Sequence, residues 1–174
     1  MRKRIGLLYA RFHFREPDKV LTFTDAVKRA RSALVVMPSE QMYSEMSRPL
    51  LQFIQSRFSG GNLTIIVPEE AKPVVRQLTR CDVINLRQDD IGSFALPKKE
   101  IINRIRRNTY DLVIDLNLKF SLPAAYMCKA SRSRLRVGFA TEYADTFFNL
   151  QIRTDASRNV KSTYERFAAC LGMF

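Results

Sequence analysis

Histidine is almost missing from this sequence: His13 is the only one, and it lies in a basic amino-terminal segment. Structural zinc sites are built from sets of cysteine and histidine, and most hydrolase triads use a histidine as the base. The three cysteines, Cys81, Cys128 and Cys170, are widely spaced, and each lies in an apolar pattern. The chain therefore offers neither a zinc set nor a histidine-dependent triad. This cysteine usage is typical of a reducing, cytoplasmic compartment.

Glycine-rich phosphate loops are missing as well. Neither G-x-G-x-x-G nor G-x-x-x-x-G-K-[ST] follows any apolar run, and the pair Gly60-Gly61 precedes such a run instead of opening a helix. Carboxylates come close together only at Asp89-Asp90 and at Asp111 with Asp115, and we interpret Asp115 as a residue that ends a strand. We therefore expect no self-sufficient nucleotide site, no cofactor and no metal centre.

Long apolar runs are also lacking. Runs such as residues 63–68 and 111–116 are far shorter than the roughly 20 residues of a membrane-spanning helix. The apolar stretch after Arg4 stops at Arg11, before the roughly 7 to 15 residues that a secretion signal needs. We predict a soluble, cytoplasmic protein that meets the inner membrane, if at all, only at its surface.

What the sequence has in excess is positive charge. It holds 29 Lys and Arg against 17 Asp and Glu in 174 residues, a formal net charge of +12. Nine basic and three acidic residues fall within residues 1–32, so this segment carries +6, half of the excess. With 46% hydrophobic and 26% charged residues, the chain has the composition and length of one globular domain. We predict a basic extension, residues 1–31, with a short helix from Thr24 to Arg31, followed by a single domain, residues 32–174.

From residue 33 on, short apolar runs rich in β-branched residues alternate with segments whose apolar residues recur every three or four positions, a pattern typical of βαβ units. The runs are apolar at consecutive positions, which suits parallel strands covered by helices on both faces. The predicted strands are residues 33–37, 63–67, 82–86, 111–116 and 135–139, and the predicted helices are about 46–58, 71–78, 98–108, 120–131 and 160–171. Residues 145–153 are either a sixth strand or an extended loop. The predicted fold class is α/β: a three-layer, Rossmann-like domain with a mainly parallel sheet of five to six strands.

In such a sheet, ligands bind in the crevice beyond the carboxyl ends of the strands. The loops expected there carry carboxylates that could act as a base, a lysine that could bind a phosphate or carboxylate, and side chains that could form hydrogen bonds with hydroxyl groups. Glu45 and Thr141 are further candidates of these kinds. The substrate-binding residues that we predict are Ser39, Glu40, Asn117, Lys119 and Glu142, and no catalytic residue is identified.

Two clusters of basic residues give a different hypothesis. Such clusters can face the phosphates of RNA, of anionic lipid headgroups or of a phosphorylated sugar. Neither interleaved aromatic residues nor an RNA-module motif accompanies them, so a solvated basic surface is favoured over a nucleic-acid site. The clusters are Arg104, Arg106 and Arg107, and Lys129, Arg132, Arg134 and Arg136.

Several short motifs follow one another in a recognisable order. The most specific are Tyr-Asp-Leu-Val-Ile-Asp-Leu-Asn at residues 110–117, Arg-Val-Gly-Phe at 136–139, and a closing helix at 164–172 that ends in Leu-Gly. Together they resemble the amino-terminal half of the ADP-heptose:lipopolysaccharide heptosyltransferases, family 9 glycosyltransferases of the two-Rossmann-domain GT-B type, over roughly residues 32–173. The resemblance implies an acceptor-side domain, half of a GT-B architecture, that binds an anionic glycan or a lipopolysaccharide precursor.

The sequence departs from the family's pattern in the loop that carries the catalytic aspartate. In a Ser-x-Gly-Asp-type loop the serine matches Ser39, but the glycine position is Met42 and the aspartate position is Tyr43. In the loop after the fourth strand, Lys119 comes early and the family's glycine is absent. The chain also ends at Phe174, where the family crosses into the domain that holds the nucleotide sugar.

These departures leave open whether the chain is an enzyme. The resemblance predicts a heptosyltransferase-like domain without a complete active site, which would need a second Rossmann-like domain or chain as a partner for transfer. The alternative, based on charge, is a non-catalytic basic adaptor that binds RNA, an anionic membrane or a protein partner.

Overall fold

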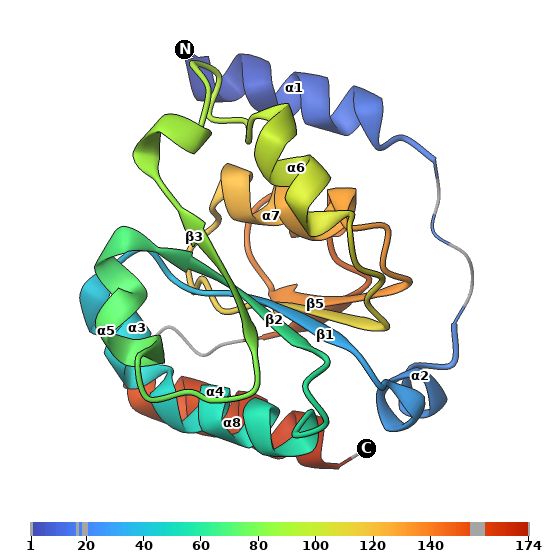
Figure 1. Cartoon of the computed structure of the whole chain (residues 1–174). Helices are drawn as coiled ribbons and strands as arrows, with labels where there is room; N and C mark the ends of the chain where they lie inside the picture. Colours follow the sequence, from blue (N-terminus) through green and yellow to red (C-terminus); the bar gives the residue numbers. More distant parts are fainter. Residues whose placement is uncertain (1, 17, 19–20, 154–158, 174) are drawn as a thin grey trace.

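The computed structural model describes residues 2–16, 18, 21–153 and 159–173, and a six-stranded sheet runs through its centre (Figure 1). The strand order is β3-β2-β1-β4-β5-β6, and every neighbouring pair is parallel. The strands are β1 (Ala33–Val36), β2 (Leu63–Pro68), β3 (Asp82–Leu86), β4 (Leu112–Asp115), β5 (Leu135–Phe139) and β6 (Leu150–Ile152). This is the α/β, Rossmann-like fold that the alternating sequence pattern predicted.

Helices cover both faces of the sheet (Figure 1). One face carries α3 (Gln41–Met46), α4 (Arg48–Arg57), α5 (Lys72–Val75) and α8 (Val160–Gly172), and the other carries α1 (Arg2–His13), α6 (Lys99–Ile105) and α7 (Leu122–Ala130). α2 (Phe23–Arg29) leads into β1, and η1 (Glu69–Ala71), η2 (Gln88–Asp90) and η3 (Ala144–Thr146) are short 3-10 turns. In the part of the chain that the structure describes, no helix combines the length and the hydropathy that crossing a bilayer would require.

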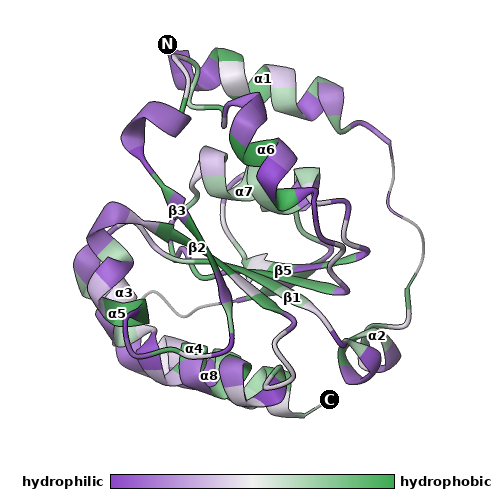
Figure 2. Ribbon diagram, in the orientation of Figure 1, coloured by the Kyte–Doolittle hydropathy of each residue, from purple (hydrophilic) through white to green (hydrophobic). Residues whose placement is uncertain are grey.

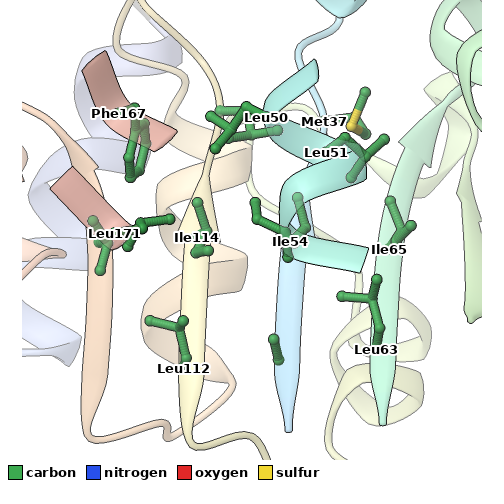
Figure 3. Close-up of a cluster of buried hydrophobic side chains, with 14 of the residues drawn as sticks. Met37, Leu50, Leu51, Ile54, Leu63, Ile65, Leu112, Ile114, Phe167 and Leu171 are labelled. Atoms are coloured by element: carbon green, nitrogen blue, oxygen red, sulfur yellow. The ribbon is translucent and has the colours of Figure 1, made fainter. Parts of the chain in front are cut away.

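Each central strand contributes to two cores, because successive residues of a strand point to opposite faces. In β1, Val35 lies in a cluster with Leu50 of α4 and Phe167 of α8 (Figure 3), whereas Leu34 lies in a second cluster with Ile101 of α6. Every residue of β1, β2, β4 and β5 is buried. Figure 2 shows the result: hydrophobic strands lie inside, and the hydrophilic residues gather on the outer surfaces of the helices. Burial on both faces explains why the sequence shows consecutive apolar residues.

The predicted elements after residue 32 agree with this structure, with two additions. Residues 145–153 contain the end of η3 and then the sixth strand, β6. The predicted helix 46–58 corresponds to α4, and a separate α3 precedes it. Pro49 lies in the first turn of α4 and has no N–H for the carbonyl of Glu45, so one continuous helix cannot run through this point. Ser47, at the junction, donates its hydroxyl to the Ser44 carbonyl at 2.8 Å.

Residues 2–13 form a helix, α1, that the sequence pattern did not predict. α1 lies against α7, with Gly6 and Ala10 buried. A Cβ atom at Gly6 would lie 2.1 Å from the Phe94 carbonyl oxygen, so only glycine permits this close approach. The rings of His13 and Phe14 lie 6.3 and 4.9 Å from the ring of Tyr126. These contacts fix the helix on the body of the domain.

The basic cluster around β5 is not a continuous surface stripe, which corrects the hypothesis that Lys129 and Arg136 face a phosphate. Arg136 is buried, and its guanidinium donates to the Phe147 carbonyl at 2.7 Å and pairs with Asp18. The Lys129 ammonium lies 2.9 Å from the same carboxylate. Because an unpaired buried charge is costly, the two cations are structural here: both pair with the carboxylate of Asp18.

A candidate ligand-binding crevice

The strand order reverses between β1 and β4, because the chain passes from β1 to β2 on one side and β4 lies on the other. The loops that follow β1 and β4 therefore diverge and leave an opening at the carboxyl ends of the two strands. A cavity of about 660 Å³ lies there, and we call it the crevice. It is lined by Lys3, Arg4, Leu7, Pro38, Ser39, Glu40, Tyr43, Gln88, Ile91, Ala95, Asn117, Leu118, Lys119, Phe120, Ser121, Leu122, Pro123 and Tyr143.

The structure brings together four of the five predicted binding residues. Ser39 and Glu40 reach the crevice from the loop after β1, and Asn117 and Lys119 reach it from the loop after β4. Glu142 is not among the described residues that line it, but its neighbour Tyr143 is. The Glu142 carboxylate beside the Tyr143 hydroxyl raises the pKa of that tyrosine. Glu142 thus lies at the edge of the crevice and not in its wall.

Lys119 is the central cation of the crevice. Its ammonium lies 3.4 Å from Glu40 Oε1 and 5.4 Å from the centre of the Tyr43 ring. The Tyr43 side chain, followed by the Glu40 carboxylate, raises the pKa of Lys119, so this group is charged at neutral pH. The side chain remains 72% exposed. An exposed ammonium held over a ring is available to pair with a carboxylate or phosphate of a ligand.

Asn117 is oriented by a buried carboxyl group. Asp115, at the end of β4, accepts hydrogen bonds from the backbone N–H of Asn117 at 3.0 Å and from Asn117 Nδ2 at 2.6 Å. Burial raises the pKa of Asp115 to about 7, and the two bonds from Asn117 lower it in part. The interpretation of Asp115 as the residue that ends its strand is confirmed. It is a positioning residue, because it fixes the amide that lines the crevice.

Aromatic rings form part of the crevice wall. Tyr43, Phe120 and Tyr143 all line it, and the rings of Phe120 and Tyr143 meet edge to face at 5.6 Å. Tyr143 has a φ angle of 67°, in the left-handed region that bulky residues rarely adopt. Pockets of this composition, with apolar faces beside a few polar groups, suit organic ligands that carry both kinds of surface, as saccharides do.

Sequence reasoning missed the contribution of α1 to the crevice. Lys3, Arg4 and Leu7 come from the first two turns of this helix, far from the strands in sequence. The available signal was the pair of small residues Gly6 and Ala10, one helical turn apart, which marks a face that lies close on another element. With Lys3, Arg4 and Lys119 against Glu40, the lining carries more positive than negative charge.

A second cavity of about 770 Å³ adjoins the crevice on the side of β2 and β3. Ser39 and Asn117 line both cavities, whereas Glu69, Glu70 and Asp89 line the second one. The opening at the switch point therefore has a cationic side and a side rich in carboxylates, with Ser39 and Asn117 between them.

Solved structures with this fold include two glycosyltransferases. The structure of E. coli heptosyltransferase WaaC with ADP is 15% identical to this chain with a TM-score of 0.59, and the match covers 80% of this chain and 46% of that one. A family 9 glycosyl transferase from Veillonella parvula is 16% identical with a TM-score of 0.65, covering 83% of this chain and 42% of that one. The resemblance to this family is thus confirmed at the level of the fold. The chain spans less than half the length of either protein.

Comparison of sequences gives one further finding. The model of a family of unknown function, DUF6913, matches residues 24–171. No curated protein matches the chain.

Proposed function

The chain belongs to DUF6913, a family of unknown function, and we propose that it binds an anionic glycan or glycolipid precursor in the crevice. In this proposal the chain acts as the acceptor-binding domain of a heptosyltransferase-like system. The fold it shares with family 9 glycosyltransferases supports the substrate class. A cytoplasmic location is part of the proposal and is in keeping with Cys81, Cys128 and Cys170, which are all unpaired.

The observation that carries the proposal is the convergence of Lys119, Asn117 and Ser39 on one opening at the switch point. A charged ammonium pairs with a carboxylate or phosphate, and the amide and hydroxyl groups pair with sugar hydroxyls. The aromatic wall beside them offers apolar contact to the ring. A neutral apolar ligand would leave Lys119 and Glu40 without new partners.

We further propose that the chain binds this ligand without transferring a sugar by itself. In the loop that resembles the family's, Tyr43 stands at the position of the catalytic aspartate and offers a phenol hydroxyl in place of a carboxylate base. Group transfer also requires the donor to be held in line with the acceptor. A second Rossmann-like domain or chain that holds the nucleotide sugar would complete the site.

The test is binding of lipopolysaccharide core fragments, measured by calorimetry with fragments that carry carboxylate or phosphate groups and with neutral fragments. We expect the anionic fragments to bind and the change Lys119→Ala to weaken this binding about tenfold, the effect of one charge-assisted hydrogen bond. Lys161→Ala is the matched control. That lysine is 65% exposed and also pairs with a glutamate, Glu165, but it lies on α8.

Two results would overturn the proposal. One is equal binding of neutral and anionic fragments. The other is an anionic-fragment affinity that Lys119→Ala leaves unchanged, or that Lys161→Ala lowers as much.

A further inference from the structure

One helix of this protein exposes its apolar side chains. On α1, Gly6 and Ala10 are buried and Leu7 packs half-buried against the core, whereas the other four large apolar side chains are exposed. These are Ile5 (46% exposed), Leu8 (66%), Tyr9 (52%) and Phe12 (70%), which we call the α1 stripe. Their spacing of three and four residues places them on one side of the helix.

This arrangement reverses the usual one, in which a surface helix turns its apolar face to the core. The structure describes nine exposed large hydrophobic residues, and the α1 stripe holds four of them. A fifth, Phe94, adjoins the stripe, because it lines one cavity together with Ile5 and Tyr9. Contacts of Gly6, His13 and Phe14 with the body of the domain hold the helix in this orientation. A contiguous apolar patch of this kind marks an interaction site.

The charges on α1 itself have one sign, while a cavity beside Ile5 and Tyr9 is lined by Lys98, Lys99 and Arg106 together with one carboxylate, Glu100. Residues 2–15 contain five Lys and Arg and no Asp or Glu. Arg4, Arg11 and Arg15 are seven and four residues apart, so they follow one edge of the α1 stripe, and all three are exposed. The Arg15 guanidinium lies 5.0 Å from the centre of the Phe12 ring, so cation and apolar surface adjoin. By contrast, α8 carries charges of both signs on its exposed side, Lys161 with Glu165.

We propose that α1 docks the protein on an anionic lipid surface. In this arrangement the α1 stripe enters the boundary between headgroups and acyl chains, while the arginines along its edge pair with lipid phosphates. Twelve residues of helix measure about 18 Å, which suits a helix that lies in the interface plane. A protein surface would have to offer an apolar groove and an acidic rim together, whereas an anionic bilayer offers both everywhere.

Docking would also place the crevice beside the lipid headgroups, because Lys3, Arg4 and Leu7 of the same helix line it. The docking proposal does not rest on what the crevice binds. Its test uses Phe12, Arg11 and Arg15, which do not line the crevice, whereas Arg4 belongs to both surfaces.

The experiment is co-sedimentation of the full chain with vesicles of phosphatidylcholine containing about 30% phosphatidylglycerol, and with vesicles of pure phosphatidylcholine. We expect binding to the anionic vesicles only, weakened by salt. Phe12→Ser removes a large apolar side chain from the stripe, and Arg11→Gln/Arg15→Gln removes two charges from its edge. Phe12→Ser should weaken binding about tenfold, and the loss of two charges about thirtyfold.

Two matched controls use residues on other elements. Met173→Ser changes an apolar side chain that is 74% exposed, close to the 70% of Phe12. Lys28→Gln/Arg29→Gln removes the same charge from exposed positions of α2. Both variants should bind like the wild type.

The proposal is overturned if the wild type does not bind anionic vesicles, if it binds both kinds equally, or if the α1 variants bind as the controls do. Sedimentation of the protein without vesicles tests whether a second copy of the chain covers the α1 stripe instead of lipid. A wild-type dimer that Phe12→Ser converts to a monomer would assign the stripe to a second copy of the chain and overturn the lipid proposal.

Discussion

At the scale of single residues, Asp115 shows how burial couples the crevice to pH. The carboxyl group is 4% exposed, and its pKa of about 7 lies above the ordinary value of 3.8 because of burial. Between these two values the folded protein holds a proton that the unfolded chain has released. The free energy of unfolding therefore contains a term that falls as the pH rises through this window.

The first prediction is that Asp115→Asn removes this term. The amide oxygen of asparagine can still accept the bonds from Asn117, but it does not ionise. Between pH 5 and 8 the free energy of unfolding should fall by about 3 kcal/mol more in the wild type than in the variant, as measured by urea denaturation. Asp25→Asn, at an exposed position of α2, is the control and should follow the wild type. Parallel curves for wild type and Asp115→Asn would contradict the raised pKa.

At the scale of elements, the position of α1 depends on the close contact between Gly6 and the Phe94 carbonyl oxygen. Gly6 leaves no room for a Cβ atom, because the nearest neighbour is a backbone oxygen that cannot rotate away. The helix therefore has to move if this position gains a side chain. Both the crevice wall and the α1 stripe depend on its present place.

The second prediction follows from this contact. In Gly6→Ala, overpacking should lower the free energy of unfolding by about 1–3 kcal/mol. The higher helix propensity of alanine offsets at most about 1 kcal/mol of this loss. Trypsin should also cut α1 faster, because its exposed Lys and Arg residues are cleaved only when the helix unwinds locally, and a helix lifted from α7 unwinds more easily. Gly60→Ala is the control, because no atom lies within 4 Å of the added Cβ there. Equal cleavage rates for the two variants would show that α1 tolerates the shift.

The elements also show where sequence patterns are informative. The strands 63–68 and 135–139 were predictable because burial on both faces requires apolar residues at consecutive positions. The helix α1 was not predictable, because its buried residues Gly6 and Ala10 carry no strong apolar signal, while four of its large apolar residues are exposed.

At the scale of the whole molecule, the chain holds one parallel sheet and one opening at its switch point. Glycine-rich phosphate loops are missing from its sequence. In the family that it resembles, the nucleotide sugar is held mainly by the other Rossmann domain. Under the proposed function, the crevice should therefore bind the anionic acceptor and not the nucleotide.

The third prediction is that ADP does not stabilise this chain. With 1 mM ADP the melting temperature should rise by less than about 2 °C, the shift of a ligand whose Kd exceeds the millimolar range. The E. coli heptosyltransferase WaaC, solved with ADP, is the positive control. A rise of 5 °C or more would show that this chain binds a nucleotide, which would contradict the proposal that a second domain or chain holds the nucleotide sugar.

The candidate site was predictable in part for a geometric reason. Ser39, Glu40, Asn117 and Lys119 come directly after strands, and the carboxyl ends of parallel strands meet at one edge, so their convergence follows from the strand assignment alone. The basic stripe was predicted less well. Sequence spacing does not reveal that Arg136 points into the protein and pairs with Asp18, more than 100 positions away.

The sequence by itself determined the α/β class, the strands, the helices after residue 32 and the loops that carry the crevice, because these depend on local periodicity. Only the tertiary structure decided that Lys3 and Arg4 join that crevice, that Asp18 neutralises part of the basic cluster, and that Phe12 faces solvent. These features depend on which distant segments lie together. The close fit of Gly6 against the Phe94 carbonyl settles the orientation of α1, and a helical pattern read along the chain contains no such partner.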